Sequence, residues 1–176
     1  MSLGDDLKVE VKKIFRTRWE SRKGQVVPQS ENLQFSNKSV LIEGTILYAD
    51  LDGSTNMVDR YKPEFAAEIY KSYLYSAAKI IRLQGGSIAS YDGDRIMAVF
   101  IGKSKNSDAA NTALKINYAV TKIINPAIEE CYPKSTFTVK QVVGIDTSDL
   151  LVARTGIRGS NDLVWVGRAA NYRHLK

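Results

Sequence analysis

Apolar residues recur along this chain with two different periods, which together predict both helices and strands. Near the start, the apolar positions follow helical spacing and predict an amphipathic helix over residues 5–22. Its apolar face consists of Leu7, Val11, Ile14, Phe15 and Trp19. From Lys23 to Asn37 the chain is polar and contains proline, which indicates a linker to the next element.

After the linker, short apolar runs alternate with longer helical patterns. A long helix is predicted over residues 64–83, directly after Pro63, because proline suits the first turn of a helix. Asp92-Gly93 separates two apolar runs and predicts a tight hairpin. Strands are expected over residues 39–50, 87–91, 95–101, 136–146, 149–156 and 162–166. Further helices are expected over residues 106–131, with a kink at Pro126, and from about Gly167 onward.

The order of these elements is β-α-β-β-α-β with additions, which indicates an α+β fold. We expect an α/β sandwich with a ferredoxin-like core and an antiparallel-rich sheet, preceded by an extra helix. Residues 1–37 would form the N-terminal helix and linker, and residues 38–176 one domain. A chain of 176 residues with 44% apolar content is sufficient for a single core.

Composition narrows the choice of partners only slightly. The net charge of +6 favours polyanions in general, but the basic residues are scattered, so a nucleic acid is not the expected substrate. A nucleic-acid-binding protein stays an alternative, and it predicts a strongly salt-dependent affinity. Cys131 is the only cysteine, which excludes an intrachain disulfide. The chain shows no apolar run of membrane-spanning length and no signal-peptide core, so we expect a soluble, cytoplasmic protein without a membrane partner.

Two aspartates stand in matching settings and carry the candidate chemistry. Asp50 ends a strand-like apolar run, whereas Asp94 follows the predicted hairpin and precedes another apolar run. A carboxylate at a strand end and one at a hairpin can meet at the rim of a single sheet. Two hard carboxylate ligands with open positions suit Mg²⁺ or Mn²⁺ carrying a triphosphate. Each aspartate taken alone could equally be an ordinary turn residue.

Four motifs in order resemble the class III nucleotidyl cyclase domain over about residues 40–176. They are Tyr48-Ala-Asp50-Leu-Asp-Gly-Ser-Thr55, Asp92-Gly-Asp94, Val142-Val-Gly-Ile-Asp-Thr147 and Gly167-Arg-Ala-Ala-Asn171. The chain is also similar to the pyrimidine cyclases of Pycsar antiphage systems, through Leu47-Tyr-Ala-Asp-Leu, Tyr91-Asp-Gly-Asp-Arg95 and the segment from Ala153 to Val166. Residues 38–176 would then be the catalytic domain.

The resemblance implies a reaction and a set of site residues. In this family the ribose 3′-oxygen attacks the α-phosphate and pyrophosphate leaves, with two divalent cations assisting. Asp50, Asp94 and the Leu51 carbonyl would hold the cations, either Mn²⁺ or Mg²⁺. Asn171 would orient the ribose across a homodimer interface, so that each site is built from both chains. The product would be a second messenger in antiviral defence, and a separate effector would recognise it.

Gly53, Ser54 and Thr55 lie where the chain passes from a strand into a short helix. Backbone amides at such a helix start, helped by Gly53, would cradle the β- and γ-phosphates. The alternative is simple capping of the helix by Ser54 or Thr55, worth about 1 kcal/mol.

One position departs from the family pattern. The family places an arginine four residues after the asparagine, to stabilise charge at the α-phosphate, and this chain has Leu175 there. The residue that would supply this positive charge is therefore unassigned. Arg154, Arg158 and Arg168 are candidate substitutes, although each could be a surface residue.

The resemblance also bears on the base, because both positions that read purines have changed. The family lysine corresponds to Ser90, and the family aspartate or threonine corresponds to Val164. Tyr48 shares a strand face with Asp50, and Arg95 could donate hydrogen bonds to a base carbonyl, so these two are the candidate pyrimidine readers. Their alternatives are a core tyrosine and an arginine paired with Asp92 or with phosphate.

These observations predict a metal-dependent cyclase that converts UTP, or next CTP, to its 3′,5′-cyclic monophosphate and pyrophosphate. A purine cyclase with an unorthodox base pocket is one alternative. A catalytically silent nucleotide-binding regulatory module is another, and the departure at Leu175 supports it.

Overall fold

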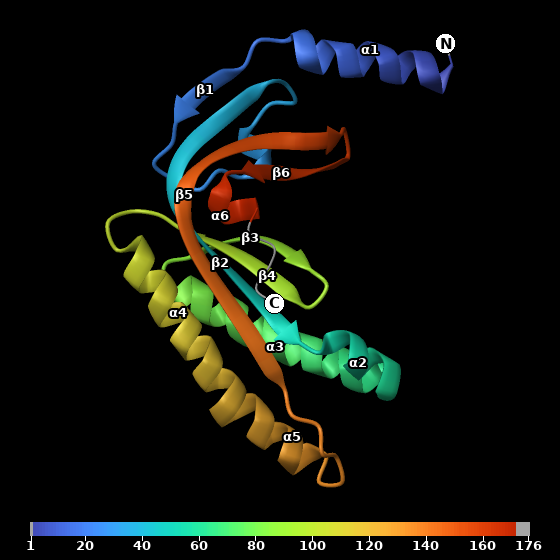
Figure 1. Ribbon diagram of the computed structural model, residues 1–176, viewed down its shortest axis with the longest axis vertical. Helices are drawn as coiled ribbons and strands as arrows, with labels where there is room; N and C mark the ends of the chain where they lie inside the picture. Colours follow the sequence, from blue (N-terminus) through green and yellow to red (C-terminus); the bar gives the residue numbers. More distant parts are fainter. Residues whose placement is uncertain (1, 172–176) are drawn as a thin grey trace.

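The protein, described by a computed structural model over residues 2–171, is built on one sheet in the strand order β3-β4-β2-β5-β6, with β1 added beside β2 (Figure 1). All neighbours in the main order are antiparallel, whereas β1 pairs with β2 in parallel. The strands are β1 (Glu20–Lys23), β2 (Lys38–Asp52), β3 (Ser87–Asp92), β4 (Arg95–Phe100), β5 (Lys140–Ile157) and β6 (Ser160–Val166). The longer helices are α1 (Leu3–Arg16), α3 (Pro63–Leu83) and α4 (Lys105–Ala119).

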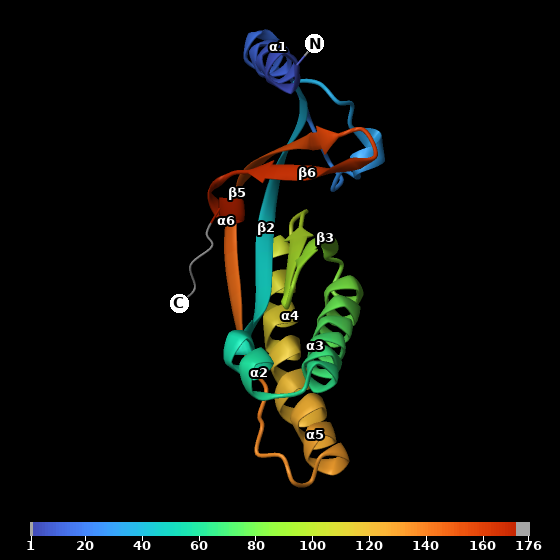
Figure 2. The same cartoon turned by 90° about the vertical axis from the view of Figure 1, so that its right-hand side faces the viewer.

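The core has the connection order β2-α3-β3-β4-α4-β5 and the spatial order β3-β4-β2-β5. This is the ferredoxin-like arrangement, so the predicted fold class is confirmed. Figure 2 shows α3 and α4 on the same side of the sheet. Their buried side chains pack on one sheet face, which we call the helix face, against residues such as Leu47, Ala49 and Ile96.

The opposite sheet face, which we call the open face, has its own buried cluster. It contains Ile46, Met97 and Leu150, with Ala169 and Ala170 of the short helix α6 (Arg168–Asn171) packed against them. Alternation along β2 separates the two faces, since Leu47, Ala49 and Leu51 belong to the helix-face cluster whereas Ile46 and Tyr48 belong to the other. Asp50 is thus on the open face.

The first helix is shorter than predicted. It runs over Leu3–Arg16, begins with a capping box between Ser2 and Asp5, and ends at Thr17. Trp19 therefore lies outside it, and Glu20–Lys23 forms strand β1 instead. The helical spacing persists to Trp19, but pairing with β2 overrides it. No side chain of α1 is buried, and Figure 1 shows the helix at the far end of the molecule.

The strands predicted over residues 136–146 and 149–156 are one continuous strand, β5, which begins at Lys140. The prediction left a break at residues 147 and 148, between the two strands. The ladder nevertheless continues without a break, with Ser148 opposite Gly44 and Asp149 opposite Glu43. Long-range pairing decided this element, because register with β2 satisfies the backbone whatever the side chains are.

The helix predicted over residues 106–131 is interrupted before its proline. It consists of α4, a π-helical turn η2 (Val120–Ile124), and α5 (Asn125–Cys131), with Pro126 in the first turn of α5. Proline lacks an N–H and its ring clashes with the carbonyl four residues earlier, so the widened turn accommodates it. The kink predicted at Pro126 thus takes the form of a π-helical turn that ends just before the proline.

The long strands β2 and β5 curl beyond the core toward β1, β6 and α1, as Figure 1 shows. None of the helices within residues 2–171 combines the length and the apolar character needed to cross a membrane.

Candidate active site

Asp50 and Asp94 lie at the same end of strands β2 and β4. Ala49 pairs with Ile96 in the antiparallel ladder, so the next residue of β2, Asp50, falls beside Arg95. Arg95 Nη2 donates to Asp50 Oδ2 at 2.6 Å, and Arg95 Nε donates to the same oxygen at 3.1 Å. Asp94 directly precedes Arg95 in the hairpin between β3 and β4. The structure thus brings the two predicted carboxylates to one rim of the sheet, with a guanidinium between the strands.

Arg95 is held in a strongly acidic surrounding. The hydrogen bond to Asp50 raises the pKa of Arg95, burial opposes the shift, and the charges of Asp50, Asp92 and Asp94 raise the pKa further. The predicted alternative partners of Arg95 were Asp92 or a phosphate, and the direct partner is Asp50 instead. Both side chains of the pair are 32% exposed, so the contact remains open to competition from a ligand.

Asp94 has an unsatisfied oxygen. Its Oδ2 atom is buried and has no hydrogen-bond partner in the part of the chain that the structure describes. A buried carboxylate oxygen is stable only with a donor or a cation beside it. This observation tests whether a divalent cation would fit the site. The residues fit, because the partly exposed carboxylate of Asp50 and the buried carboxylate of Asp94 lie at the same end of neighbouring strands.

The ligand set within the described residues is small. No group of three histidine, cysteine, aspartate or glutamate side chains gathers anywhere in residues 2–171. The side chain of Leu51 is buried in the helix-face cluster, so only its carbonyl could face a cation. Any remaining ligands would be backbone, water or nucleotide oxygens, which are the usual partners of Mg²⁺ at triphosphate sites.

Tyr73 is a neighbour of this pair that the sequence did not single out. It lies in the middle of α3, it is 1% exposed, and its hydroxyl has no hydrogen-bond partner among the described residues. Burial raises the pKa of Tyr73, and the charges of Asp50 and Asp94 raise it further. The phenol therefore lies within electrostatic range of both carboxylates. The only sequence signal was helical phase, since Ile69, Tyr73 and Ala77 follow one buried stripe.

Tyr48 connects the open face to the last helix. Its hydroxyl donates to the Ala170 carbonyl at 2.8 Å. Tyr48 and Asp50 are both partly buried and flank the fully buried Ala49, in agreement with a shared strand face. Tyr48 is partly buried, so it is neither a core residue nor a surface residue. It lies two residues before Asp50 and contacts α6, the helix that carries Asn171.

Gly53 occupies the turn into α2 (Ser54–Arg60) with a left-handed φ of 73°. It is itself the N-cap residue, and no side chain caps the helix. Capping by Ser54 or Thr55, the alternative to a phosphate cradle, is therefore wrong for this structure. The cradle itself stays a prediction.

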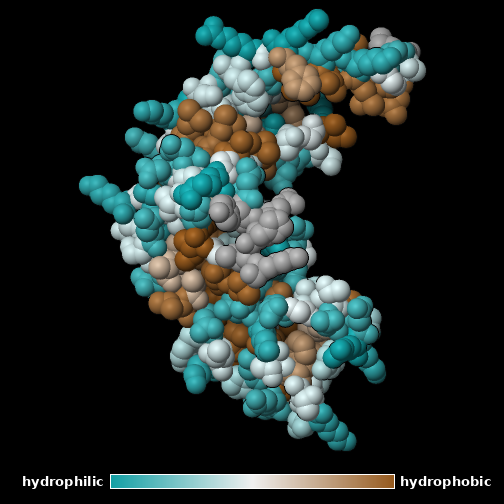
Figure 3. Space-filling view, viewed as in Figure 1, coloured by the Kyte–Doolittle hydropathy of each residue, from teal (hydrophilic) through white to brown (hydrophobic). Residues whose placement is uncertain are grey.

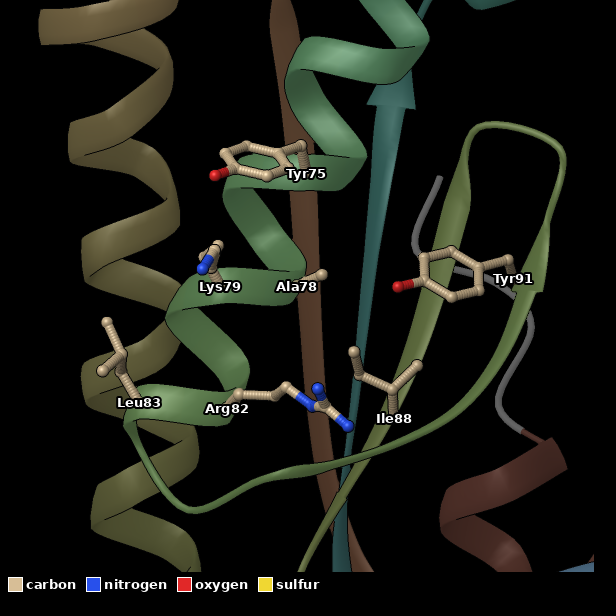
Figure 4. Close-up of a pocket in the computed structure, with 7 residues that line it drawn as sticks. All are labelled: Tyr75, Ala78, Lys79, Arg82, Leu83, Ile88 and Tyr91. Carbon is tan, nitrogen blue, oxygen red and sulfur yellow. The ribbon is translucent and has the colours of Figure 1, made fainter.

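A groove of about 580 Å³ lies between α3 and the edge strand β3 (Figure 4). Figure 4 shows Tyr75, Lys79 and Arg82 along α3, with Tyr91 across from them on β3. Tyr91 pairs with Ile96, which belongs to the helix face. The groove is therefore on the opposite side of the sheet from Asp50, and neither metal-ligand candidate lines it.

Curated uridylate cyclases resemble the chain over nearly its whole length. The protein of Xanthomonas perforans is 54% identical over 173 residues, which are 98% of this chain and 75% of that protein. The protein of Burkholderia cepacia is 54% identical over 174 residues, which are 98% of this chain and 76% of that protein. The chain belongs to the uridylate cyclase family. It is thus a nucleotidyl cyclase, as its motifs implied. No protein-family model matches it.

Solved cyclase structures share the fold of this uridylate cyclase family member at lower identity. A guanylyl cyclase matches with a TM-score of 0.67 at 22% identity, over 74% of this chain and 66% of that one. A class III adenylyl cyclase-like ATP-binding protein from Pseudomonas aeruginosa matches with a TM-score of 0.67 at 19% identity, over 94% of this chain and 38% of that one. These likenesses concern the fold, and they confirm the class III cyclase architecture.

Asn171 ends α6 and is exposed. Among the described residues, no hydrogen bond or ion pair joins its side chain to Asp50 or Asp94. Leu175, at the position of the family arginine, lies outside the described residues.

The three candidate substitutes for that arginine have different surroundings. Arg154 donates to Asn161 and to the Leu33 carbonyl, and its Cζ lies 4.1 Å from the centroid of the Phe35 ring. It is thus held by β6 and by the segment that precedes β2. Arg168 is paired with Asp146 at 3.0 Å, but 64% of its side chain is exposed. Arg158 is exposed in the turn between β5 and β6.

The two positions that read purines in other class III cyclases lie on different strands. A β-bulge between Ile88 and Ser90 places Ser90 opposite Met97, a residue of the open-face cluster. Ser90 is therefore on the same side of the sheet as Asp50. Val164 pairs with Ala153 in β5 and is 39% exposed.

Proposed function

We propose that this member of the uridylate cyclase family converts UTP to 3′,5′-cyclic UMP and pyrophosphate. The observation that carries the proposal is the 54% identity to uridylate cyclases over 98% of the chain. The carboxylate pair Asp50 and Asp94 supports it, because it lies where a triphosphate and its cations would be held. Ser90 and Val164 support a base other than a purine, since neither can make the family's purine contacts.

Asp50, Asp94 and the Leu51 carbonyl would hold two divalent cations, Mn²⁺ or Mg²⁺. When bound, such cations favour deprotonation of the ribose 3′-hydroxyl and stabilise the charge of the leaving pyrophosphate. The buried Asp94 carboxylate supports this assignment, because its Oδ2 atom has no hydrogen-bond partner among the described residues and a cation beside the carboxylate would offset the cost of burying it. The backbone around Gly53, Ser54 and Thr55 would bind the β- and γ-phosphates.

Tyr48 and Arg95 would shape the base pocket. Arg95 donates to Asp50 through Nε and Nη2, which leaves its other N–H groups for a base carbonyl. A cation bound beside Asp50 would compete with the guanidinium for the carboxylate. Uracil suits Arg95 better than cytosine does, because it offers two carbonyl oxygens.

The cyclase would act as a homodimer, with Asn171 of one chain completing the site of the other. Exposed apolar residues on the open face support this. Val142 lies directly opposite Asp50 and is 40% exposed. Figure 3 shows further hydrophobic side chains gathered along α1 and the curved strands on the face in view. In the cell the product would serve as an antiviral second messenger recognised by a separate effector.

Product analysis with all four ribonucleoside triphosphates and Mn²⁺ tests the proposal. We expect cyclic UMP from the wild type and none from Asp94→Ala, while Asp59→Ala, which removes an exposed carboxylate on α2, stays active. Cyclic CMP as the main product would show that CTP, and not UTP, is the preferred substrate. A purine product would contradict the assignment of the base pocket. A folded dimer that binds nucleotide without forming any cyclic product would indicate a silent regulatory module.

A further inference from the structure

Tyr73 places a polar atom where the core of the cyclase offers nothing to satisfy it. The residue is 1% exposed, and its hydroxyl is buried without a hydrogen-bond partner among residues 2–171. A phenylalanine would fill the same volume without the cost of desolvating a hydroxyl. A tyrosine in this setting is therefore informative, because packing alone does not require its oxygen.

The surroundings of Tyr73 are those of the carboxylate pair. Tyr73 belongs to the same buried cluster as Ala49, Leu51 and Ile96. Ala49 and Leu51 flank Asp50 in β2, and Ile96 follows Arg95 in β4. The Tyr73 hydroxyl is a hydrogen-bond donor, and Ile96 of its cluster lies two residues after Asp94.

A second buried atom without a hydrogen-bond partner among the described residues belongs to Asp94. Asp94 Oδ2 is buried and unpartnered, and an ionised carboxylate can only accept hydrogen bonds. A buried donor and a buried acceptor, each without a partner in the part of the chain that the structure describes, are chemically complementary. Carboxylates that ligate metals are commonly oriented by hydrogen bonds from neighbouring side chains.

We propose that Tyr73 is a positioning residue of the cyclase site, whose hydroxyl donates to Asp94 Oδ2 when a divalent cation is bound. The hydrogen bond fixes the carboxylate so that its other oxygen faces the cation. The inference rests on the proposed role of Asp94 as a ligand, and it adds a residue from α3, on the opposite face of the sheet.

The test is a titration of the nucleotide-free protein with Mn²⁺, followed by electron paramagnetic resonance of the free ion. We expect Tyr73→Phe to weaken Mn²⁺ binding about tenfold, the lower end of the effect seen when such a supporting hydrogen bond is removed. Tyr70→Phe, one turn earlier on α3, serves as the matched control and should bind Mn²⁺ like the wild type. Without metal, Tyr73→Phe should melt at or above the wild-type temperature, because it loses only an unsatisfied hydroxyl.

Asp94→Asn separates the failure of this inference from the failure of the proposed function. If Asp94→Asn weakens Mn²⁺ binding and Tyr73→Phe does not, the role of Tyr73 is overturned and the metal site stands. If neither change affects binding, the metal assignment and the role of Tyr73 fall together. In the Asp94→Asn background, Tyr73→Phe should cause no further loss, and an additional tenfold loss there would contradict a contact between the two groups.

Discussion

At the scale of single residues, the site is defined by the Arg95 guanidinium, which is hydrogen-bonded to Asp50 and directly follows Asp94 in the chain. Arg95 makes two hydrogen bonds to Asp50 Oδ2, the atom that a cation would also need. An ion pair of which both side chains are about one-third exposed contributes about 1 kcal/mol, not more. That value is small enough for a cation and a nucleotide to displace the arginine together, so Arg95 can take part in both the resting and the loaded state.

The substitution Arg95→Gln should therefore change two quantities in opposite directions. We expect Mn²⁺ affinity without nucleotide to rise about fivefold, because a contact worth about 1 kcal/mol no longer competes for Asp50. The KM for UTP should rise, because the base loses a donor. Mn²⁺ titration and initial-rate kinetics measure the two effects. Arg82→Gln removes the same charge from the far face of the sheet and should leave both unchanged; an unchanged Mn²⁺ affinity in Arg95→Gln would contradict the competition.

At the scale of elements, α6 depends on its neighbours. Within the described residues it comprises four residues, Arg168–Asn171, and a segment of that length is too short to be stable alone. Arg168 Nη2 donates to the Thr147 carbonyl and forms an ion pair with Asp146 Oδ1. The Ala169 amide donates to Ser148 Oγ, and the Ala170 carbonyl accepts from Tyr48. These contacts hold the helix that carries Asn171 against β5 and β2.

We expect Arg168→Gln to reduce kcat much more than it reduces stability. The ion pair is largely exposed on the arginine side, so the free energy of unfolding should fall by about 1 kcal/mol or less. A displaced Asn171 can lower the rate about a hundredfold, because small errors in position are costly to catalysis. Thermal melting and steady-state kinetics give the two values. Lys38→Gln, which removes the similarly exposed pair with Glu20, is the control and should leave kcat unchanged.

At the scale of the whole molecule, no hydrogen bond or ion pair among the described residues joins Asn171 to Asp50 or Asp94. Asn171 is exposed, Asp94 is partly buried, and the open face exposes apolar residues such as Val142, which lies opposite Asp50. A second copy related by a two-fold axis would cover this face and complete two equivalent sites.

Mixing two inactive variants tests whether the sites are shared. Asp94→Asn and Asn171→Ala should each be inactive, but after subunit exchange half of the dimers contain one of each. In such a dimer one site carries both defects and the other carries none, so about a quarter of wild-type activity should return. A mixture of Asp50→Asn and Asp94→Asn is the matched control, because both defects fall on the same half of every site and no activity should return. Equal recovery in both mixtures, or none in either, would contradict the shared site.

What the sequence determined by itself was local or periodic. Short apolar runs located β2, β3 and β4, Asp92-Gly93 located the hairpin, and Pro63 marked the start of α3. Ordered motifs identified the cyclase family and the rim carboxylates Asp50 and Asp94. These features depend on residues close together in the chain, so local propensity and spacing were sufficient.

The tertiary structure decided whatever depends on partners far away in the chain. Pairing with β2 ended α1 at Arg16 and carried β5 through Ser148-Asp149, against the local pattern. Antiparallel register placed Arg95 on Asp50, and the packing of α3 brought the Tyr73 hydroxyl near both carboxylates. No spacing in the sequence encodes such contacts, because they arise only when the sheet and its helices close around one core, and this is where the site acquires its chemistry.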